Sequence, residues 1–378
     1  MFMNKILVFD ISFLTGNNRT PIIEKIRYWQ SKKTQVTIFC TSEAKKNYKK
    51  LIKGTKFITI HQDKSPNNRF LLIFEDLKRN FLSLRHLGKI ARVRYGCIYS
   101  ISSVLDLVLI PWICKTIYNI KWTTVFDNTV EKDAPGNRPI KLLAYFFYRL
   151  SLFFLKKADY LFVVTKLIKL NLIQEGFSKS RLIVTGNGVE NRYIENGKQA
   201  KKYIYDSIFI GRINETKGLY YMARVVKKIV SKMPNYKIAV MGRGDDESEK
   251  KYLKYLKEVG VYNNFVFLGF LTGKSKFDAI KQSKSFLFLS PSESFGVALL
   301  EAYCCGLPCF VYDLDAYHYI YKKNDIHTFP VGEVVEVAAK MIKVIKQISK
   351  PHLPRKNMVR RFNWKRIADI EYEKITSG

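Results

Sequence analysis

The sequence predicts an α/β fold built from two doubly wound domains, and three observations support this prediction. Short apolar runs of strand length alternate with helical segments, and the alternation occurs twice along the chain. The 378 residues exceed what one hydrophobic core normally organises and suit two domains of similar size. A polar stretch at 195–203 lies between the two series of strands and is the expected linker.

The first series contains the strands expected at 6–9, 36–40, 57–60, 97–101, 123–126 and 160–164. Helical stretches lie between them. In one of them, 21–30, Thr20 is the expected N-cap and Pro21 occupies the first helical position. The apolar helix at 142–155 is expected to be buried against the sheet of the first domain. The alternative for this helix is that it dips into a membrane interface.

The second series contains the strands expected at 206–210, 237–241, 265–268, 285–289 and 309–312. Helices are expected at 218–232, 247–259, 274–282, 297–304 and 332–349. In doubly wound sheets, ligands bind beyond the carboxyl ends of the strands. We therefore expect the active site in the cleft between the two domains.

The stretch 286–310, FLFLSPSESFGVALLEAYCCGLPCF, is the most informative part of the chain. Its pattern predicts a strand, a polar loop, a helix that follows Gly296 and ends near Gly306, and a second strand. The N-terminus of that helix is directed at the carboxyl edge of the sheet and offers an anion site. Glu293 on the loop and Glu301 on the helix can hold hydroxyls on either side of a bound phosphate. The alternative is an ordinary βαβ unit with two surface glutamates.

This segment resembles the Glu-x7-Glu region of the retaining glycosyltransferases of family 4, which have the GT-B fold. The matching positions are Ser290, Glu293, Ser294, Phe295, Gly296, Glu301, Ala302, Gly306 and Pro308. The resemblance implies two doubly wound, Rossmann-like domains that face a central cleft. It also implies a donor site in which Glu293 binds hydroxyls of the sugar and Glu301 holds the ribose. The donor-binding residues of this segment would further include Ser294, Phe295, Gly296 and Val297, whose backbone amides face the diphosphate.

A second loop, 211–218 (GRINETKG), follows an apolar strand and opens a helix. Arg212 can clamp two phosphate oxygens, while Lys217 acts as a point charge. The loop matches the Gly-Arg-x4-Lys-Gly element of the family, so the resemblance implies that both side chains bind the diphosphate. A basic helix start with solvated charges is the alternative.

Four further residues come from weaker matches to the family (Gly242 and Leu271) or from positions that depart from its pattern (Gly16 and Asp127). Gly242 lies in a Gly-x-Gly turn, and a simple tight turn explains it equally well. Leu271 lies just after a Phe-Leu-Gly segment, in the backbone that usually holds the nucleotide base in the family. Gly16 is a single glycine where the family usually has a glycine-rich loop near the donor phosphates. Asp127 stands where the family commonly has a histidine, and it either orients a sugar or only caps its strand.

Two more matches set the domain boundaries. The sequence NGVE at 187–190 resembles the signature that closes the N-terminal domain of the family, and FNW at 362–364 resembles the start of the helix that crosses back to it. We expect an acceptor-side N-terminal domain at 1–198, completed by the helix 362–378. The nucleotide-sugar-binding domain is expected at 199–361.

The resemblance implies a transfer on one face of the sugar, in which the leaving phosphate accepts the proton of the acceptor. The candidate catalytic residues are Glu293, Arg212, Lys217 and Asp127. We expect no metal and no cofactor, with the nucleotide-diphosphate sugar as co-substrate. The DLD sequence at 313–315 is interpreted as a loop because it follows a late strand. The six cysteines form no CxxC pair, and the histidines are scattered.

The composition adds a strong positive charge. There are 65 Lys and Arg against 32 Asp and Glu, which gives a net charge of +33. Such a charge attracts anionic lipids, phosphorylated substrates or nucleic acid. Basic residues gather at 45–56 and 85–94, in the acceptor-side half. We expect a glycan or lipid-linked acceptor from surface polysaccharide or glycolipid synthesis, and an anionic membrane surface as a partner. A lysine-rich composition without function is the alternative.

The apolar runs are shorter than the ~18–20 residues that a membrane span needs. The N-terminal run fits a first strand better than a signal peptide. We expect a cytoplasmic protein, peripheral at the inner membrane face. A nucleotide-sugar epimerase of the same fold is the nearest alternative function. A basic nucleic-acid-binding protein is the alternative from another class, but the charge is diffuse and no nucleic-acid motif is present, so we expect no nucleic-acid partner.

Overall fold

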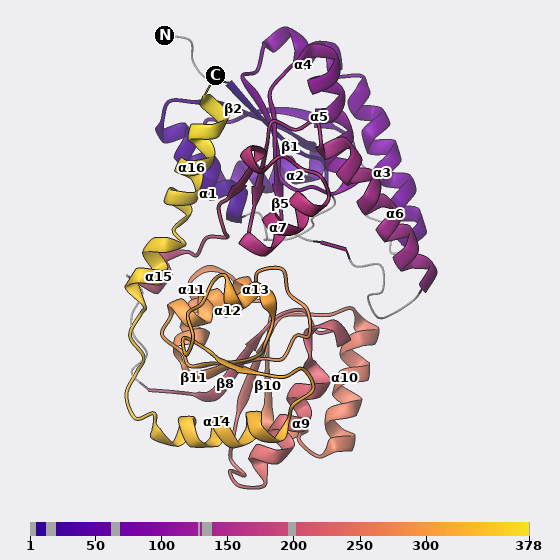
Figure 1. Cartoon of the computed structure of the whole chain (residues 1–378). Coiled ribbons are helices and arrows are strands. Elements are labelled where there is room, and N and C mark those ends of the chain that lie inside the picture. Colours follow the sequence, from indigo (N-terminus) through magenta and orange to yellow (C-terminus); the bar gives the residue numbers. More distant parts are fainter. Residues whose placement is uncertain are drawn as a thin grey trace. The chain divides into compact units, whose positions relative to one another are not determined.

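The computed structural model describes residues 5–12, 20–61, 69–127, 129–130, 138–195 and 202–377. The chain divides into two compact units. Unit 1 comprises Met1–Asn187 and Trp364–Gly378, and unit 2 comprises Gly188–Asn363. Each unit contains one parallel sheet with helices on both faces, as shown in Figure 1.

The sheet of unit 1 has the strand order β3-β2-β1-β4-β5-β6-β7, in which neighbouring strands are parallel. The chain reverses its direction of winding between β1 and β4, as in doubly wound folds. The strands are β1 (Lys5–Asp10), β2 (Gln35–Thr41), β3 (Lys56–Ile60), β4 (Cys97–Ser100), β5 (Trp122–Phe126), β6 (Tyr160–Val163) and β7 (Leu182–Val184). The helices are α1 (Thr20–Ser31), α2 (Ser42–Leu51), α3 (Arg69–Leu84), α4 (Leu87–Val93), α5 (Leu105–Tyr118), α6 (Arg138–Leu155), α7 (Lys166–Gln174) and α16 (Trp364–Thr376).

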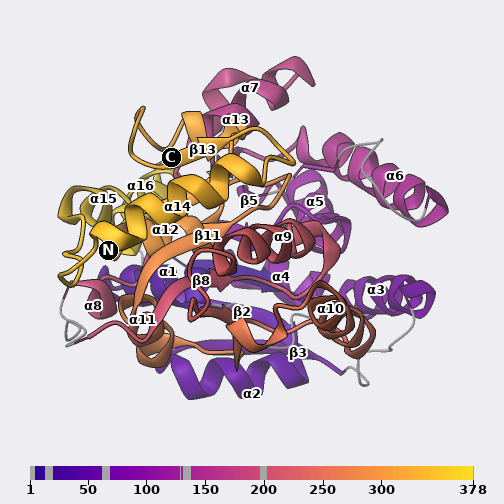
Figure 2. The same cartoon turned by 90° about the horizontal axis from the view of Figure 1, so that it is seen from below.

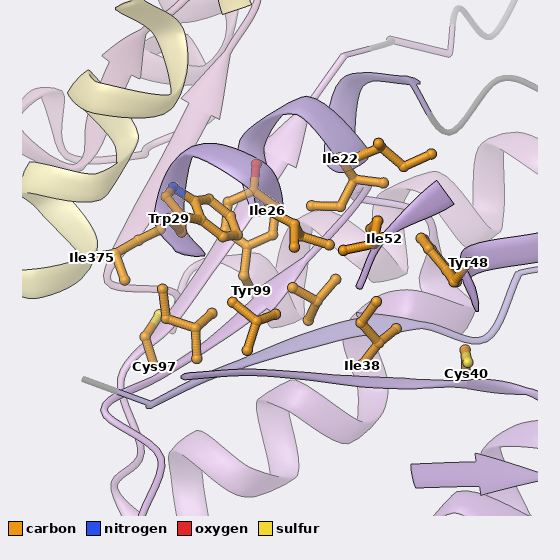
Figure 3. Packing of buried hydrophobic residues seen from close by; sticks show 14 of the residues in the cluster. Ile22, Ile26, Trp29, Ile38, Cys40, Tyr48, Ile52, Cys97, Tyr99 and Ile375 are labelled. Atoms are coloured by element: carbon orange, nitrogen blue, oxygen red, sulfur yellow. The ribbon is translucent and has the colours of Figure 1, made fainter. Parts of the chain in front are cut away.

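Two hydrophobic clusters cover the two faces of this sheet, because successive side chains of a strand point to opposite faces. Ile6 and Val8 of β1 belong to the cluster that contains Trp29 of α1 and Ile375 of α16, drawn in Figure 3. The intervening Leu7 and Phe9 belong to the other cluster, formed with α4 and α5. A strand buried on both faces explains why β1 reads as a continuous apolar run.

The last helix of the chain is part of unit 1. Figure 1 shows α16 beside α1. Lys25 Nζ of α1 lies 2.7 Å from Glu371 Oε1 of α16, and the Tyr99 hydroxyl of β4 donates to Glu371 Oε2 at 2.7 Å. Glu371 is completely buried. This buried, hydrogen-bonded charge pair joins residues 346 positions apart in the sequence.

The sheet of unit 2 has the order β10-β9-β8-β11-β12-β13 and is also parallel. Its strands are β8 (Tyr205–Ile210), β9 (Ile238–Met241), β10 (Phe265–Gly269), β11 (Ser283–Phe288), β12 (Cys309–Tyr312) and β13 (His327–Phe329). Its helices are α8 (Asn191–Ile194), α9 (Leu219–Val230), α10 (Asp246–Val259), α11 (Gly273–Lys281), α12 (Val297–Cys304), α13 (Asp315–His318), α14 (Val335–Gln347) and α15 (Lys356–Arg361).

The expected strands are all present, and their ends differ from the prediction by at most two residues. The prediction missed β7 and β13, which are three residues long each and give no periodicity to detect. Thr20 lies inside α1 rather than capping it, and the helix expected at 332–349 is shorter, at Val335–Gln347. Among the described helices, none combines the length and the apolar character needed to cross a bilayer.

The expectation that the helix 142–155 is buried against the sheet is wrong for one side of that helix. In the structure it lies within α6, and Leu142, Phe146 and Phe153 are exposed. The opposite side of α6 packs on α5, where the rings of Trp112 and Phe154 are 4.8 Å apart. The helix therefore buries one stripe and leaves an apolar stripe open, which apolar content alone could not reveal.

Candidate active site

The candidate site lies in unit 2, at the carboxyl ends of the parallel strands β8, β9, β10 and β11. The loop that follows β11 carries Glu293 and leads into α12. The loop that follows β8 carries Arg212 and Lys217 and leads into α9. Because parallel strands end at the same edge of a sheet, these loops share one edge.

Gly218 allows the β8 and β11 loops to touch. A Cβ atom on Gly218 would lie only 1.7 Å from the carbonyl oxygen of Leu289, and the φ angle of Gly218 is +72°. Both facts require a glycine here. The Ser290 hydroxyl adds a hydrogen bond across the junction, donating to the carbonyl of Thr216 at 3.3 Å. The two loops are thus fixed against each other through their backbones.

This contact brings together two of the predicted catalytic residues. Lys217 Nζ lies 2.6 Å from Glu293 Oε1, and both side chains are largely shielded from solvent. The same ammonium lies 5.9 Å from the centroid of the Phe288 ring, a cation–π distance. Glu293 lies on the loop that enters α12, where free backbone N–H groups favour a negative charge.

Glu301, the second predicted glutamate, is buried on α12 and paired with a residue that the sequence analysis missed. Lys276 of α11 places its Nζ 2.5 Å from Glu301 Oε1. Burial raises the pKa of the Glu301 carboxyl above its ordinary value, the Lys276 ammonium opposes that shift, and the nearby Glu190 adds to it. Lys276 gave no signal because it is one of many lysines and its partner lies on another helix.

The other donor-binding candidates of unit 2 lie around these pairs. The N–H of Gly242 donates to the carbonyl of Gly269 at 2.9 Å, and a Cβ atom on Gly242 would lie 1.9 Å from the carbonyl oxygen of Gly211. The turn after β9 is thereby drawn against the turns after β8 and β10. Leu271 follows β10 and is half-buried, whereas Arg212 is exposed. Among the described residues, Arg212 forms no ion pair, so the structure brings together Lys217 and Glu293 without it.

The residues at the start of α12 differ in exposure. Phe295 is buried, and its ring meets the ring of Phe362 edge-on at 5.9 Å. Ser294 is half-buried. Val297, the first residue of α12, is exposed. The buried Phe295 ring anchors this turn, and the backbone after it leads into the helix.

Two predicted site residues lie outside unit 2. Asp127 follows β5 of unit 1 and accepts a hydrogen bond from the Ser102 hydroxyl at 3.4 Å. Partial desolvation raises the pKa of the Asp127 carboxyl, although its side chain keeps access to solvent. Gly16 lies outside the residues that the structure describes. The structure therefore groups Glu293, Lys217 and Glu301 in unit 2, and Asp127 belongs to unit 1.

The described residues contain no group of three or more His, Cys, Asp or Glu side chains suited to holding a metal ion. In the DLD sequence, Asp313 contacts His318 Nε2 at 2.7 Å, and Asp315 begins α13 instead of lying in a loop as expected. A cavity of about 560 Å³ lies beside β13, lined by Asp313, His318, Lys322 and Lys340 among others. No predicted donor-binding residue lines this cavity.

The comparison with known families finds a similarity within unit 2. Residues 190–360 match the model of the family described as Glycosyl transferases group 1. The match covers almost the whole of unit 2. The match spans α8 to α15 and includes Lys217, Lys276, Glu293 and Glu301.

Curated relatives named as glycosyltransferases are similar to parts of the chain. An uncharacterised glycosyltransferase of Methanocaldococcus jannaschii is 29% identical over 221 residues, which cover 54% of this chain and 51% of that protein. A phosphatidyl-myo-inositol mannosyltransferase of Mycolicibacterium smegmatis is 26% identical over 169 residues, which cover 43% of this chain and 42% of that protein. The chain thus spans about half the length, or less, of the curated relatives that it matches.

Solved structures show that the fold extends over the whole chain. Anabaena HepE, solved in complex with UDP and glucose, has a TM-score of 0.75 at 14% identity and covers 99% of this chain and 100% of its own. The structure of TarM has a TM-score of 0.73 at 12% identity, with 99% of each chain covered. The predicted GT-B fold is therefore confirmed: both units are doubly wound, with parallel sheets of 7 and 6 strands.

Proposed function

We propose that this protein is a retaining glycosyltransferase that moves a sugar from a nucleotide-diphosphate donor to a hydroxyl of the acceptor. The contact between Lys217 and Glu293, 2.6 Å apart beside the N-terminus of α12, carries this proposal. It joins a cation suited to a phosphate with a carboxylate suited to sugar hydroxyls. Both lie on loops that meet through Gly218.

The donor diphosphate changes the partner of Lys217. In the free site the ammonium is neutralised by Glu293. A diphosphate carries more negative charge than one carboxylate, so it attracts Lys217 together with the exposed Arg212. Glu293 then becomes available to accept hydrogen bonds from the hydroxyls of the donor sugar, and Glu301 accepts those of the ribose.

The reaction breaks the bond between the anomeric carbon and the oxygen of the β-phosphate. The acceptor oxygen forms its bond to that carbon on the same face, and its proton passes to the departing phosphate oxygen. Lys217, Arg212 and the N–H groups of Phe295 to Val297 stabilise the charge that grows on the diphosphate. These groups supply the positive charge for which other enzymes use a metal ion, and we propose that no metal is required. Asp127 is proposed to orient a sugar in the same reaction.

The acceptor is proposed to be a lipid-linked intermediate in the synthesis of a surface polysaccharide or glycolipid. The names of two relatives support this class: the phosphatidyl-myo-inositol mannosyltransferase, and a GDP-mannose:cellobiosyl-diphosphopolyprenol alpha-mannosyltransferase of Xanthomonas oryzae that is 24% identical over 163 residues. The net charge of +33 supports an anionic membrane surface as a partner. We propose that the protein works in the cytoplasm, at the inner face of the membrane.

A thermal-shift screen with UDP-, GDP- and ADP-sugars tests donor binding, because a ligand at 100 times its dissociation constant stabilises the folded state by about 2.7 kcal/mol. Arg212→Ala and Lys217→Ala should each weaken binding of the nucleotide sugar and slow turnover. NMR of the product should show the same anomeric configuration as the donor. EDTA should leave the rate unchanged.

Three results would contradict the proposal. Unchanged donor binding and turnover in both variants would show that Arg212 and Lys217 do not bind the diphosphate. An inverted product would exclude the retaining mechanism. Epimerised donor without glycosylated acceptor would identify a nucleotide-sugar epimerase instead.

A further inference from the structure

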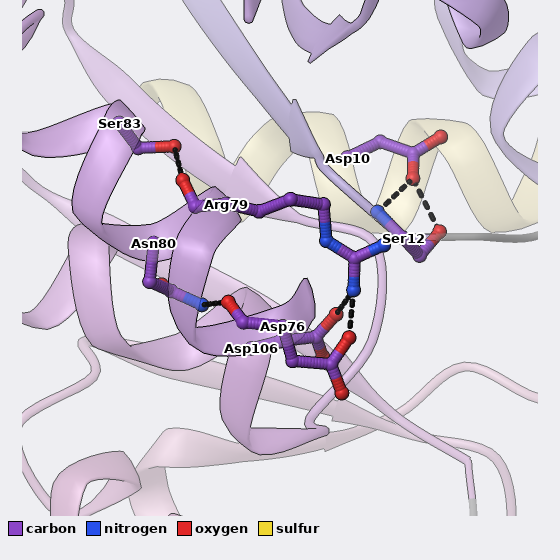
Figure 4. Close-up of polar contacts among 7 residues, drawn as sticks. All are labelled: Asp10, Ser12, Asp76, Arg79, Asn80, Ser83 and Asp106. Carbon is purple, nitrogen blue, oxygen red and sulfur yellow. Dashed lines mark hydrogen bonds and ion pairs between the residues drawn. The ribbon is translucent and has the colours of Figure 1, made fainter. Parts of the chain in front are cut away.

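Helix α3 buries three polar side chains and exposes four apolar ones, while its Leu82 packs against the core cluster of α4 and α5. Its buried stripe consists of Arg79, Asn80 and Ser83. Figure 4 shows hydrogen bonds of these groups: the Ser83 hydroxyl donates to the carbonyl of Arg79 at 2.7 Å, and Asn80 Nδ2 donates to the carbonyl of Asp76 at 3.0 Å. The Arg79 guanidinium pairs with Asp76 and reaches Asp106 of α5 at 3.4 Å.

The outer stripe of α3 is apolar. Phe74, Leu77, Phe81 and Leu84 follow helical spacing along it and are exposed by 69%, 57%, 63% and 39%. A surface helix of a globular protein normally presents the opposite arrangement. Because the inner polar groups form a connected network with α5, the apolar stripe cannot turn inward without breaking that network.

Helix α6 has a second apolar stripe of the same kind. Leu142, Phe146 and Phe153 lie at helical spacing and are exposed by 46%, 59% and 67%. Both α3 and α6 pack against α5, on the same face of the sheet of unit 1, and Figure 2 shows the three helices on one side of it. We call the seven side chains of the two stripes the α3–α6 outer face.

Basic side chains flank the α3–α6 outer face. Lys78 is exposed next to Leu77, and the Arg85 guanidinium lies 6.0 Å from the centroid of the Phe81 ring. Lys156 and Lys157 are exposed just beyond the end of α6. Phenylalanine and leucine framed by lysine and arginine suit the boundary between lipid head groups and acyl chains. A second copy of the chain is a poor occupant, because its net charge of +33 repels the first.

We propose that the α3–α6 outer face inserts into the head-group region of an anionic lipid bilayer and anchors unit 1 there. The proposal rests on the proposed function only in so far as a lipid-linked acceptor requires the protein to work at a membrane. It differs from attraction by surface charge alone, because buried phenylalanine contributes binding that salt does not screen.

Co-sedimentation with vesicles tests this surface in the full chain. Vesicles of phosphatidylcholine alone are compared with vesicles that also contain phosphatidylglycerol, each at low and at high salt. The native protein should bind the anionic vesicles and keep part of this binding at high salt. Phe74→Ser with Phe81→Ser, or Phe146→Ser with Phe153→Ser, should lower the salt-resistant binding at least tenfold. Phe270→Ser with Leu353→Ser is the matched control, because those side chains, at 55% and 76%, are exposed to a similar extent but lie in unit 2.

A direct measurement of insertion accompanies the binding assay. Phe153→Cys, labelled with the dye NBD, should shift its emission to shorter wavelength with anionic vesicles, whereas Phe270→Cys carrying the same label should not. The six native cysteines are buried, which favours labelling of the new thiol.

The outcomes separate the surface from the proposed function. Absence of vesicle binding, or binding that salt abolishes equally in the native protein and the variants, overturns the inference. Dimerisation that the phenylalanine variants abolish, without vesicle binding, assigns the face to a second copy and also overturns it. Vesicle binding without any nucleotide binding would support the insertion of the α3–α6 outer face and contradict the proposed function.

Discussion

Lys276 sets the charge at the end of the site where Glu301 is proposed to hold the ribose. Its ammonium opposes the rise in the pKa of the buried Glu301 carboxyl, so Lys276→Met should raise that pKa further. A protonated carboxyl is a poorer acceptor for ribose hydroxyls. The affinity of the variant for a nucleoside diphosphate should therefore be about tenfold lower than that of the native protein. As the pH is lowered, the affinity of the variant should begin to fall at a higher pH than that of the native protein. Titration calorimetry across pH measures both effects.

Controls for this prediction are available on the same helix. Lys274 also pairs with a carboxylate, Asp278 at 2.5 Å, but both side chains are on the surface. Lys274→Met should leave affinity and pH profile unchanged, and Lys276→Arg should restore most of the affinity. The groups that face Glu301 are Lys276, Glu190 and the thiols of its own helix. An unchanged pH profile in Lys276→Met would show that its contact with Glu301 has no role in binding.

At the scale of single residues, the sequence predicted part of the site. Lys217 and Glu293 each lie in a motif of recognisable spacing, and the structure brings them into contact. Lys276 was not predictable, because its role depends on how α11 packs beside α12. A lysine-rich chain offers no way to select one lysine without that packing.

At the scale of elements, the contact between the β8 and β11 loops depends on Gly218. Gly218→Ala should destabilise the fold and weaken nucleotide binding, because its Cβ atom would collide with the backbone at Leu289. Gly260 has a similar φ of +79° with nothing within 4 Å of an added Cβ atom. Gly260→Ala should therefore cost only the conformational strain, about 1–2 kcal/mol. Urea unfolding of the two variants compares them, and equal costs would show that the loops can separate freely.

The attachment of α16 gives a second prediction for an element. Glu371→Leu should cost about 3–5 kcal/mol of unfolding free energy, because it leaves the buried Lys25 ammonium without its carboxylate. Lys25→Met combined with Glu371→Leu should recover much of this loss, because no buried charge remains. Urea unfolding of the single and double variants measures the difference. Additive losses would contradict the coupling.

Two helices also show why a sequence pattern does not predict which face of a helix is buried. The spacing of α3 predicts an amphipathic helix, but periodicity does not say which face turns inward. The polar face of α3 is buried because the Arg79 guanidinium forms an ion pair with Asp106 of α5. The same ambiguity made the prediction for 142–155 wrong, since an apolar helix can bury either one side or both.

For the whole molecule, the excess of positive charge should govern the first encounter with a membrane. Reversing Lys45, Lys46, Lys49 and Lys50 of α2 to Glu should weaken association with anionic vesicles at low salt, and little difference should remain at high salt. Salt screens surface charges over a Debye length of about 8 Å at physiological ionic strength, which is why the effect should fade at high salt. Donor binding, which is proposed to depend on residues of unit 2, should not change. Co-sedimentation and thermal shift measure the two effects. Vesicle binding that is unchanged by the charge reversal would show that the lysines of α2 have no role in membrane association.

The return of α16 to unit 1 has a consequence for the order in which the protein acquires its structure. Translation produces Lys25 early and Glu371 only after all of unit 2 has been made. Domains usually fold one after another as they emerge from the ribosome. Here unit 1 lacks its last helix, α16, until the end of translation. Unit 2 is contiguous in the sequence and can fold first. A nascent chain stalled before residue 364 should therefore protect unit 2 from protease while unit 1 is still cleaved.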